Sequence, residues 1–125
     1  MRTIKMAVIL VVEDDRFVRE SVEWLITELG HSTLMASDLA GALEHLSAPK
    51  QIDALFVDIG LNARALGGCE IAERAVDLRP GLRVLYTSGN PLTADLARHF
   101  VAGGHFIEKP YSFERLERTV DELLH

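Results

Sequence analysis

Cysteine is almost missing from the 125 residues: Cys69 stands alone, so no disulfide can form within the chain. Cysteines and histidines also lack the number and spacing of a structural zinc site. No stretch rich in proline, glycine or serine divides the sequence, and no internal repeat is present. We therefore expect residues 1–125 to form a single domain, with no separate output domain and no disulfide or zinc ion holding it together.

Positive charge is scarce as well. Lys and Arg number 13 against 19 Asp and Glu, which leaves a formal net charge of −6. This balance gives no general attraction to the phosphates of nucleic acids or to anionic membranes. Long apolar runs are absent too, because the run at residues 7–12 is too short for a signal-peptide core or a membrane span. We expect a cytoplasmic protein that binds neither nucleic acid nor membranes directly.

What the chain does contain is a regular alternation of short apolar runs and segments with helical periodicity. The apolar runs predict strands at 7–12, 32–36, 54–58, 84–87 and 105–107. The segments between them predict helices at 16–29, 38–47, 69–78 and 93–101, and a last helix capped by Ser112. In the helix at 93–101, Leu96, Ala97 and Phe100 are expected to face inward. Strict alternation predicts an α/β fold, a doubly wound five-stranded parallel sheet.

Polar side chains follow the predicted strands at their carboxyl ends. They are Glu13, Asp14 and Asp15 after the first strand, Asp58 at the end of the third, Thr87 and Ser88 at the end of the fourth, and Lys109 after the fifth. Ligands of doubly wound sheets bind beyond the carboxyl ends of the strands. These side chains are therefore expected to meet in one crevice.

Several carboxylates in one crevice repel one another unless a cation or raised pKa values relieve the repulsion. The candidate ligands are all oxygens, which favours Mg²⁺ or Mn²⁺ over zinc or copper. A magnesium ion held by few carboxylates usually completes its shell with water and phosphate oxygens. Phosphoryl chemistry with Asp58 as the nucleophile is the natural use of such a site, and Lys109 and the Ser88 hydroxyl would bind the remaining phosphoryl oxygens.

Four segments together resemble the response regulator receiver domain of two-component signalling, over essentially the whole chain. They are Val11-Val12-Glu13-Asp14-Asp15, Leu55-Phe56-Val57-Asp58, Leu85-Tyr86-Thr87-Ser88-Gly89 and Phe106-Ile107-Glu108-Lys109-Pro110-Tyr111. The resemblance implies a flavodoxin-like (βα)5 fold with strand order 2-1-3-4-5. It also implies a signalling domain, not an enzyme in its own right, that catalyses only its own aspartyl phosphorylation and dephosphorylation.

The resemblance also implies a role for each site residue. These roles are Asp58 as phosphoacceptor, Asp14 as direct metal ligand, Glu13 as metal ligand through water, the Gly60 carbonyl as metal ligand, Ser88 as switch hydroxyl with Thr87 as the alternative, Phe106 as switch aromatic, and Lys109 as phosphate-binding lysine before a cis Pro110. The donor would be a phosphohistidine on a histidine kinase or histidine phosphotransfer protein. Phosphorylation would change the surface of the fourth helix, fifth strand and fifth helix, which an unidentified downstream protein would read; a monomer or weak dimer is expected.

The chain departs from the family pattern beside the phosphoacceptor. The segment 59–67 is about two residues longer than the usual loop, and Asn62 stands where proline is common. Gly60 and Asn90 occupy positions at which family members often carry side chains that affect hydrolysis of the acyl phosphate. The longer loop is expected to alter partner choice or the lifetime of the phosphorylated form.

Other interpretations of the same residues remain open. The acidic triplet could serve as a helix cap, Phe106 could belong to the core, and the five histidines are interpreted as ordinary surface or boundary residues. On the first helix, Phe17, Ser21 and Trp24 lie opposite the inward face, where they are either partly buried or a docking face for the kinase or phosphotransfer partner. The alternative function is a receiver-like protein-interaction module that works without phosphorylation.

Overall fold

Five parallel strands form one sheet in the order β2-β1-β3-β4-β5. The computed structural model describes residues 6–125. The strands are β1 (Val8–Val12), β2 (Ser32–Ala36), β3 (Ala54–Asp58), β4 (Arg83–Ser88) and β5 (His105–Glu108). The predicted doubly wound sheet and its strand order are both confirmed, and strand order reverses between β1 and β3.

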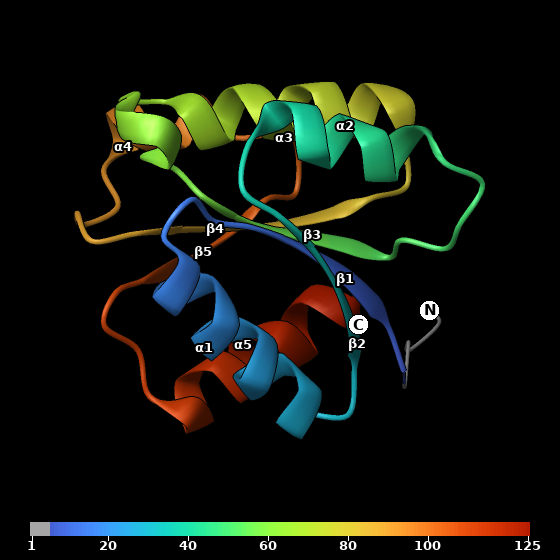
Figure 1. Cartoon of the computed structure of the whole chain (residues 1–125). Coiled ribbons are helices and arrows are strands. Elements are labelled where there is room, and N and C mark those ends of the chain that lie inside the picture. Colours follow the sequence, from blue (N-terminus) through green and yellow to red (C-terminus); the bar gives the residue numbers. More distant parts are fainter. Residues whose placement is uncertain (1–5) are drawn as a thin grey trace.

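Helices cover both faces of the sheet. On one face lie α1 (Arg16–Glu28) and α5 (Phe113–Leu124), and on the other lie α2 (Leu39–Ser47), α3 (Gly67–Leu78) and α4 (Ala94–Ala97), as Figure 1 shows. Side chains alternate between the two faces along each strand. In β3, Leu55 and Val57 therefore pack under α2 and α3, whereas Phe56 packs under α1 and α5. Burial on both faces explains why this strand is an unbroken apolar run.

The fourth helix is much shorter than predicted. Sequence periodicity predicted a helix over 93–101 with Ala97 facing inward, but α4 ends at Ala97, which is exposed. The Val101 N–H donates to the Tyr86 hydroxyl at 2.9 Å, and the Phe100 ring stacks on Tyr86 at a centroid distance of 4.0 Å. These contacts with β4 turn the chain away from the helix axis, so tertiary packing overrides the local pattern.

The segment after β3 is partly ordered into a 3-10 turn, η1 (Leu61–Ala63), whose Leu61 side chain is buried. Asn62 and Ala63 both have left-handed backbone conformations, with φ of 55° and 60°. The next helix, α3, begins at Gly67, two residues before its predicted start at Cys69. A Cβ atom on Gly68 would lie 2.2 Å from the Asp58 carbonyl oxygen, so only glycine allows α3 to begin this close to the end of β3.

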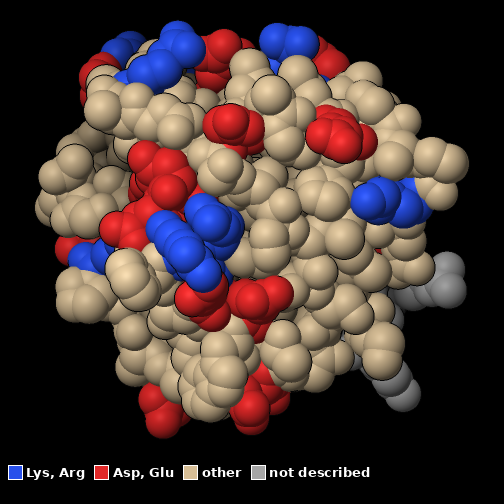
Figure 2. All heavy atoms as spheres, viewed as in Figure 1, with Lys and Arg blue, Asp and Glu red and all other residues tan. Residues whose placement is uncertain are grey.

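Figure 2 presents the charged side chains on one face of the molecule. Acidic and basic side chains lie intermingled there, and no broad basic area is visible among the described residues. Within residues 6–125, no helix has the length and apolar character needed to cross a membrane.

Candidate functional site

Three carboxylates meet at the carboxyl edge of the sheet. Glu13 and Asp14 directly follow β1, and Asp58 ends β3, the strand that pairs with β1 in parallel register. One oxygen from each of the three lies within 4.8 Å of the others. The strand-end residues that the sequence singled out are therefore neighbours in space.

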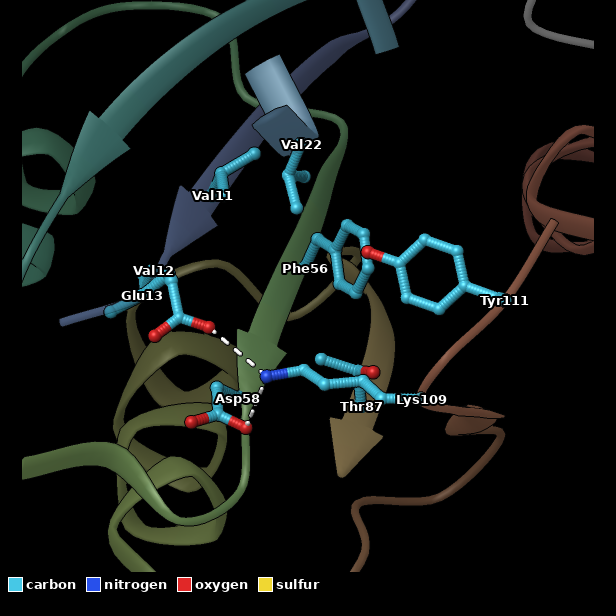
Figure 3. Close-up of a pocket in the computed structure, with 9 residues that line it drawn as sticks. All are labelled: Val11, Val12, Glu13, Val22, Phe56, Asp58, Thr87, Lys109 and Tyr111. Carbon is cyan, nitrogen blue, oxygen red and sulfur yellow. Dashed lines mark hydrogen bonds and ion pairs between the residues drawn. The ribbon is translucent and has the colours of Figure 1, made fainter. Parts of the chain in front are cut away.

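Lys109 reaches into this group from the end of β5. Its Nζ lies 3.2 Å from Glu13 Oε1 and 3.3 Å from Asp58 Oδ1, as Figure 3 shows. Burial alone would lower the pKa of Lys109, but the negative charges of Asp58 and Glu13 outweigh burial and raise it. The ammonium group therefore stays charged and balances part of the negative charge of the three carboxylates.

The acidic pair has one buried and one exposed member. Glu13 is buried, and its second oxygen, Oε2, accepts a hydrogen bond from the Asp15 N–H at 3.0 Å. Burial raises the pKa of Glu13 above its ordinary value. Asp14 is exposed, and although its slight burial opposes the change, hydrogen bonds involving Glu13 and the Asn62 N–H lower its pKa. Asp14 is thus the carboxylate of the pair that solvent and ions reach most easily.

The donor set fits a hard divalent cation. All three side chains offer carboxylate oxygens, which Mg²⁺ and Mn²⁺ prefer. Asp14 Oδ2 accepts the Asn62 N–H, whereas both oxygens of Glu13 are already engaged, Oε1 by Lys109 and Oε2 by the Asp15 N–H. This difference suits a direct contact from Asp14 and a water-mediated one from Glu13. Gly60 lies two residues beyond Asp58, in the turn after β3.

The two candidate hydroxyls occupy different places. Thr87 is the pairing partner of Asp58 between β3 and β4, and it lines a small pocket that Asp58 and Lys109 also line. Its hydroxyl, however, donates to the Ile107 carbonyl at 2.9 Å. The Ser88 Oγ accepts a hydrogen bond from the Asn90 N–H at 3.0 Å, which leaves the Ser88 proton free to rotate. Ser88 lines a neighbouring hollow of about 330 Å³ together with Gly60.

The predicted switch aromatic, Phe106, is half-buried on β5. Its ring stacks on Phe100 at a centroid distance of 6.2 Å, and Phe100 in turn stacks on Tyr86. Phe106 thus belongs to an aromatic row that connects β5 with the segment after α4.

Two residues beside the site were not singled out for it by sequence reasoning. Tyr111 lines the small pocket next to Lys109. Burial, and to a smaller extent the nearby negative charges of Glu13 and Asp58, raise the pKa of Tyr111 to about 12. The only sequence feature that pointed to Tyr111 was its position directly after the Lys109–Pro110 peptide. That peptide is cis, as predicted. Asn62 donates its backbone N–H to Asp14 Oδ2 at 3.1 Å, a contact that depends on the fold of the longer loop and had no signal in the sequence.

The aromatic pair on α1 is exposed. The side chains of Phe17 and Trp24 are 80% and 62% exposed, and Ser21 between them is exposed as well, which answers the question of partial burial. A groove runs beside this face between α1 and the segment Lys109–Tyr111. Lys109 is among the residues that line the groove, so a partner bound in it would lie next to the acidic site.

Comparisons with known proteins agree with this geometry. The family model of the response regulator receiver domain matches residues 9–121. Response regulator MprA of Mycobacterium avium is 29% identical over 117 residues, which cover 93% of this chain and 50% of that protein. The chain thus spans about half the length of the curated relatives it matches.

Solved structures with a similar fold are found as well. A response regulator receiver protein from Sinorhizobium medicae superimposes with a TM-score of 0.83 at 25% identity, covering 96% of this chain and 95% of that one. NtrX from Brucella abortus superimposes with a TM-score of 0.79 at 30% identity, covering 95% of this chain and 26% of that one.

Proposed function

Because the chain belongs to the response regulator receiver domain family, we propose that its 125 residues act as one cytoplasmic signalling switch that accepts a phosphoryl group on Asp58. The observation that carries the proposal is the meeting of Glu13, Asp14, Asp58 and Lys109 at one point of the sheet edge. The donor is a phosphohistidine on a histidine kinase or a histidine phosphotransfer protein.

Each side chain has a distinct task in the transfer. An Asp58 carboxylate oxygen attacks phosphorus in line, the bond from phosphorus to the histidine nitrogen breaks, and that nitrogen keeps the electron pair. Lys109 is close enough to Asp58 to bind a phosphoryl oxygen once the acyl phosphate has formed. Asp14, Asp58, the Gly60 carbonyl and, through water, Glu13 would hold a Mg²⁺ or Mn²⁺ ion, which would supply charge neutralisation for the transferring group.

Ser88 is the better candidate for the switch hydroxyl. The Thr87 hydroxyl is buried and already donates to the Ile107 carbonyl, so moving it would break that hydrogen bond. Ser88 can turn toward the phosphoryl oxygens without breaking a bond in which its own proton takes part. Movement of Ser88 would then change the packing of Phe106 and the surface of α4, β5 and α5 that a downstream protein reads.

Phosphorylation of Asp58 is tested by incubating the protein with Mg²⁺ and a small phosphoryl donor. One acid-labile phosphate is expected on the wild type and on an Asp77→Asn control, which changes an exposed aspartate on α3. No phosphate is expected on Asp58→Asn. If neither small donors nor a kinase modifies the wild type, the proposal fails and a phosphate-independent interaction module takes its place.

The switch hydroxyl is tested with Ser88→Ala. This variant is expected to accept phosphate but to lose the phosphorylation-dependent shift of the Phe106 resonances in NMR spectra. Thr87→Val is expected to lose stability, because the buried hydrogen bond from the Thr87 hydroxyl to the Ile107 carbonyl is lost. A full Phe106 response in phosphorylated Ser88→Ala would transfer the role to Thr87.

The exposed aromatic face of α1 is the proposed docking site for the phosphotransfer partner. Aromatic side chains of this size are common anchors in interfaces, and Lys109 is among the residues that line the adjoining groove. The double variant Phe17→Ala/Trp24→Ala is expected to slow phosphotransfer from the partner at least tenfold while leaving phosphorylation by a small donor unchanged. Leu78→Ala, which removes an exposed apolar side chain from α3, is the control. Unchanged transfer to the double variant would rule out this docking face.

A further inference from the structure

Both backbone polar groups of Glu13 are held from the β2 side of the sheet. The Glu13 N–H donates to the Ala36 carbonyl at 3.1 Å, as the last bond between β1 and β2. Strand β2 ends at Ala36, so it offers no further N–H for the Glu13 carbonyl. That carbonyl instead accepts a hydrogen bond at 2.8 Å from Nη1 of Arg19, a side chain on α1.

The carbonyl that Arg19 holds belongs to the peptide between Glu13 and Asp14. Because a peptide unit is planar, fixing its oxygen restricts the positions of both flanking Cα atoms. The two carboxylates of the acidic pair project from those Cα atoms. A single guanidinium contact therefore restrains the direction of two of the three carboxylates at the site.

Arg19 is well placed for this task and has no competing carboxylate. It lies in the first turns of α1, which is anchored by the Asp15 side chain through bonds from the N–H groups of Phe17 and Val18. Its own N–H donates to the Asp15 carbonyl at 2.9 Å. None of the ion pairs within residues 6–125 includes Arg19, so its described side-chain bond is the one to Glu13.

We propose that Arg19 is a positioning residue for the cation site, which holds the Glu13–Asp14 peptide so that both carboxylates face Asp58. The inference rests on the proposed function, because it assumes that the carboxylates bind Mg²⁺. Groups that orient metal ligands from outside the coordination shell commonly change metal affinity by 10- to 100-fold, roughly, when they are removed. Arg19 contacts the backbone of the acidic pair and not the carboxylates themselves. We therefore expect a change in Mg²⁺ affinity near the lower end of that range.

The test is the Mg²⁺ affinity of the purified protein, measured by isothermal titration calorimetry. Arg19→Gln is expected to bind Mg²⁺ roughly tenfold more weakly than the wild type. Arg19→Lys keeps one donor and is expected to recover part of that loss. Arg19→Met keeps the apolar stem, replaces Arg19→Gln if that variant does not fold, and is expected to show the same loss.

Arg79→Gln is the matched control for a general loss of stability. The Arg79 guanidinium donates to the carbonyls of Leu46, Ala48 and Lys50 at 3.0, 2.8 and 2.8 Å, on the α2 side of the sheet and away from the acidic group. Its removal is expected to lower the melting temperature more than Arg19→Gln does, and to leave Mg²⁺ affinity unchanged.

The outcomes separate the inference from the proposed function. Wild-type affinity in Arg19→Gln or Arg19→Met would overturn the inference, as would an equal loss of affinity in Arg79→Gln. Absence of Mg²⁺ binding by the wild type would instead overturn the proposed function. Weak binding in the Arg19 variants, partial recovery in Arg19→Lys and normal binding in Arg79→Gln would establish the positioning role.

Discussion

Replacing Lys109 with glutamine removes the ammonium group that contacts Glu13 and Asp58 and leaves the three carboxylates in place. At an effective dielectric constant of about 20, each contact of Lys109 carries about 5 kcal/mol of Coulomb attraction, most of which the loss of hydration offsets. Deleting one partner of a buried pair costs about 3–5 kcal/mol, and an exposed pair contributes about 1 kcal/mol or less. The side chains of Lys109, Glu13 and Asp58 are 28%, 6% and 15% exposed, between these limits.

We therefore expect Lys109→Gln to lower the free energy of unfolding by about 2 kcal/mol when no divalent cation is present. Unfolding entropy of about 2.1 cal/mol/K per residue converts this loss to a fall in melting temperature of about 8 °C. Thermal unfolding followed by circular dichroism in EDTA measures it. Lys50→Gln is the control, because Lys50 is exposed and contacts His45, not a carboxylate.

Magnesium should reverse much of this loss. A cation bound at the proposed site would repel Lys109 at the same carboxylates, and coupling between two binding events is reciprocal. Removing Lys109 is therefore expected to raise Mg²⁺ affinity by about tenfold, which corresponds to about 1.4 kcal/mol. The melting temperatures of Lys109→Gln and the wild type should approach each other as Mg²⁺ is added. A stability difference that stays constant with Mg²⁺, together with unchanged affinity, would refute the shared site.

Two further predictions concern the surrounding fold. Gly68→Ala is expected to destabilise the protein by about 2 kcal/mol or more, because the added Cβ would collide with the Asp58 carbonyl. Urea unfolding measures this loss. Gly60→Ala is the control and should be about as stable as the wild type, because a Cβ on Gly60 meets open space. The pKa of His31 is lowered by burial, and its Nδ1 accepts the Ala7 N–H at 3.0 Å. Below the ordinary pKa of 6.5, His31 takes up a proton more readily in the unfolded chain than in the folded chain, so the free energy of unfolding should fall as pH drops through this value. An equal dependence of the free energy of unfolding on pH in His31→Gln would contradict this.

The sequence was most informative where buried parallel strands impose their own pattern. The run at 54–58 coincides with β3, whose residues 54–57 are apolar and buried because helices cover both faces of that strand. It was least informative after β4. There the segment 93–101 has helical periodicity, yet packing of Phe100 and Val101 against Tyr86 ends α4 early.

The same contrast holds within the site. By itself, the sequence determined which acidic and basic residues stand at the carboxyl ends of the strands, because strand ends are marked by abrupt changes from apolar to charged residues. Only the tertiary structure decided what holds those residues: the Arg19 bond to Glu13, the Asn62 bond to Asp14 and the engagement of Thr87 with Ile107. Each of these bonds joins residues whose distance depends on how helices, loops and strands pack, and periodicity along the chain carries no information about such distances.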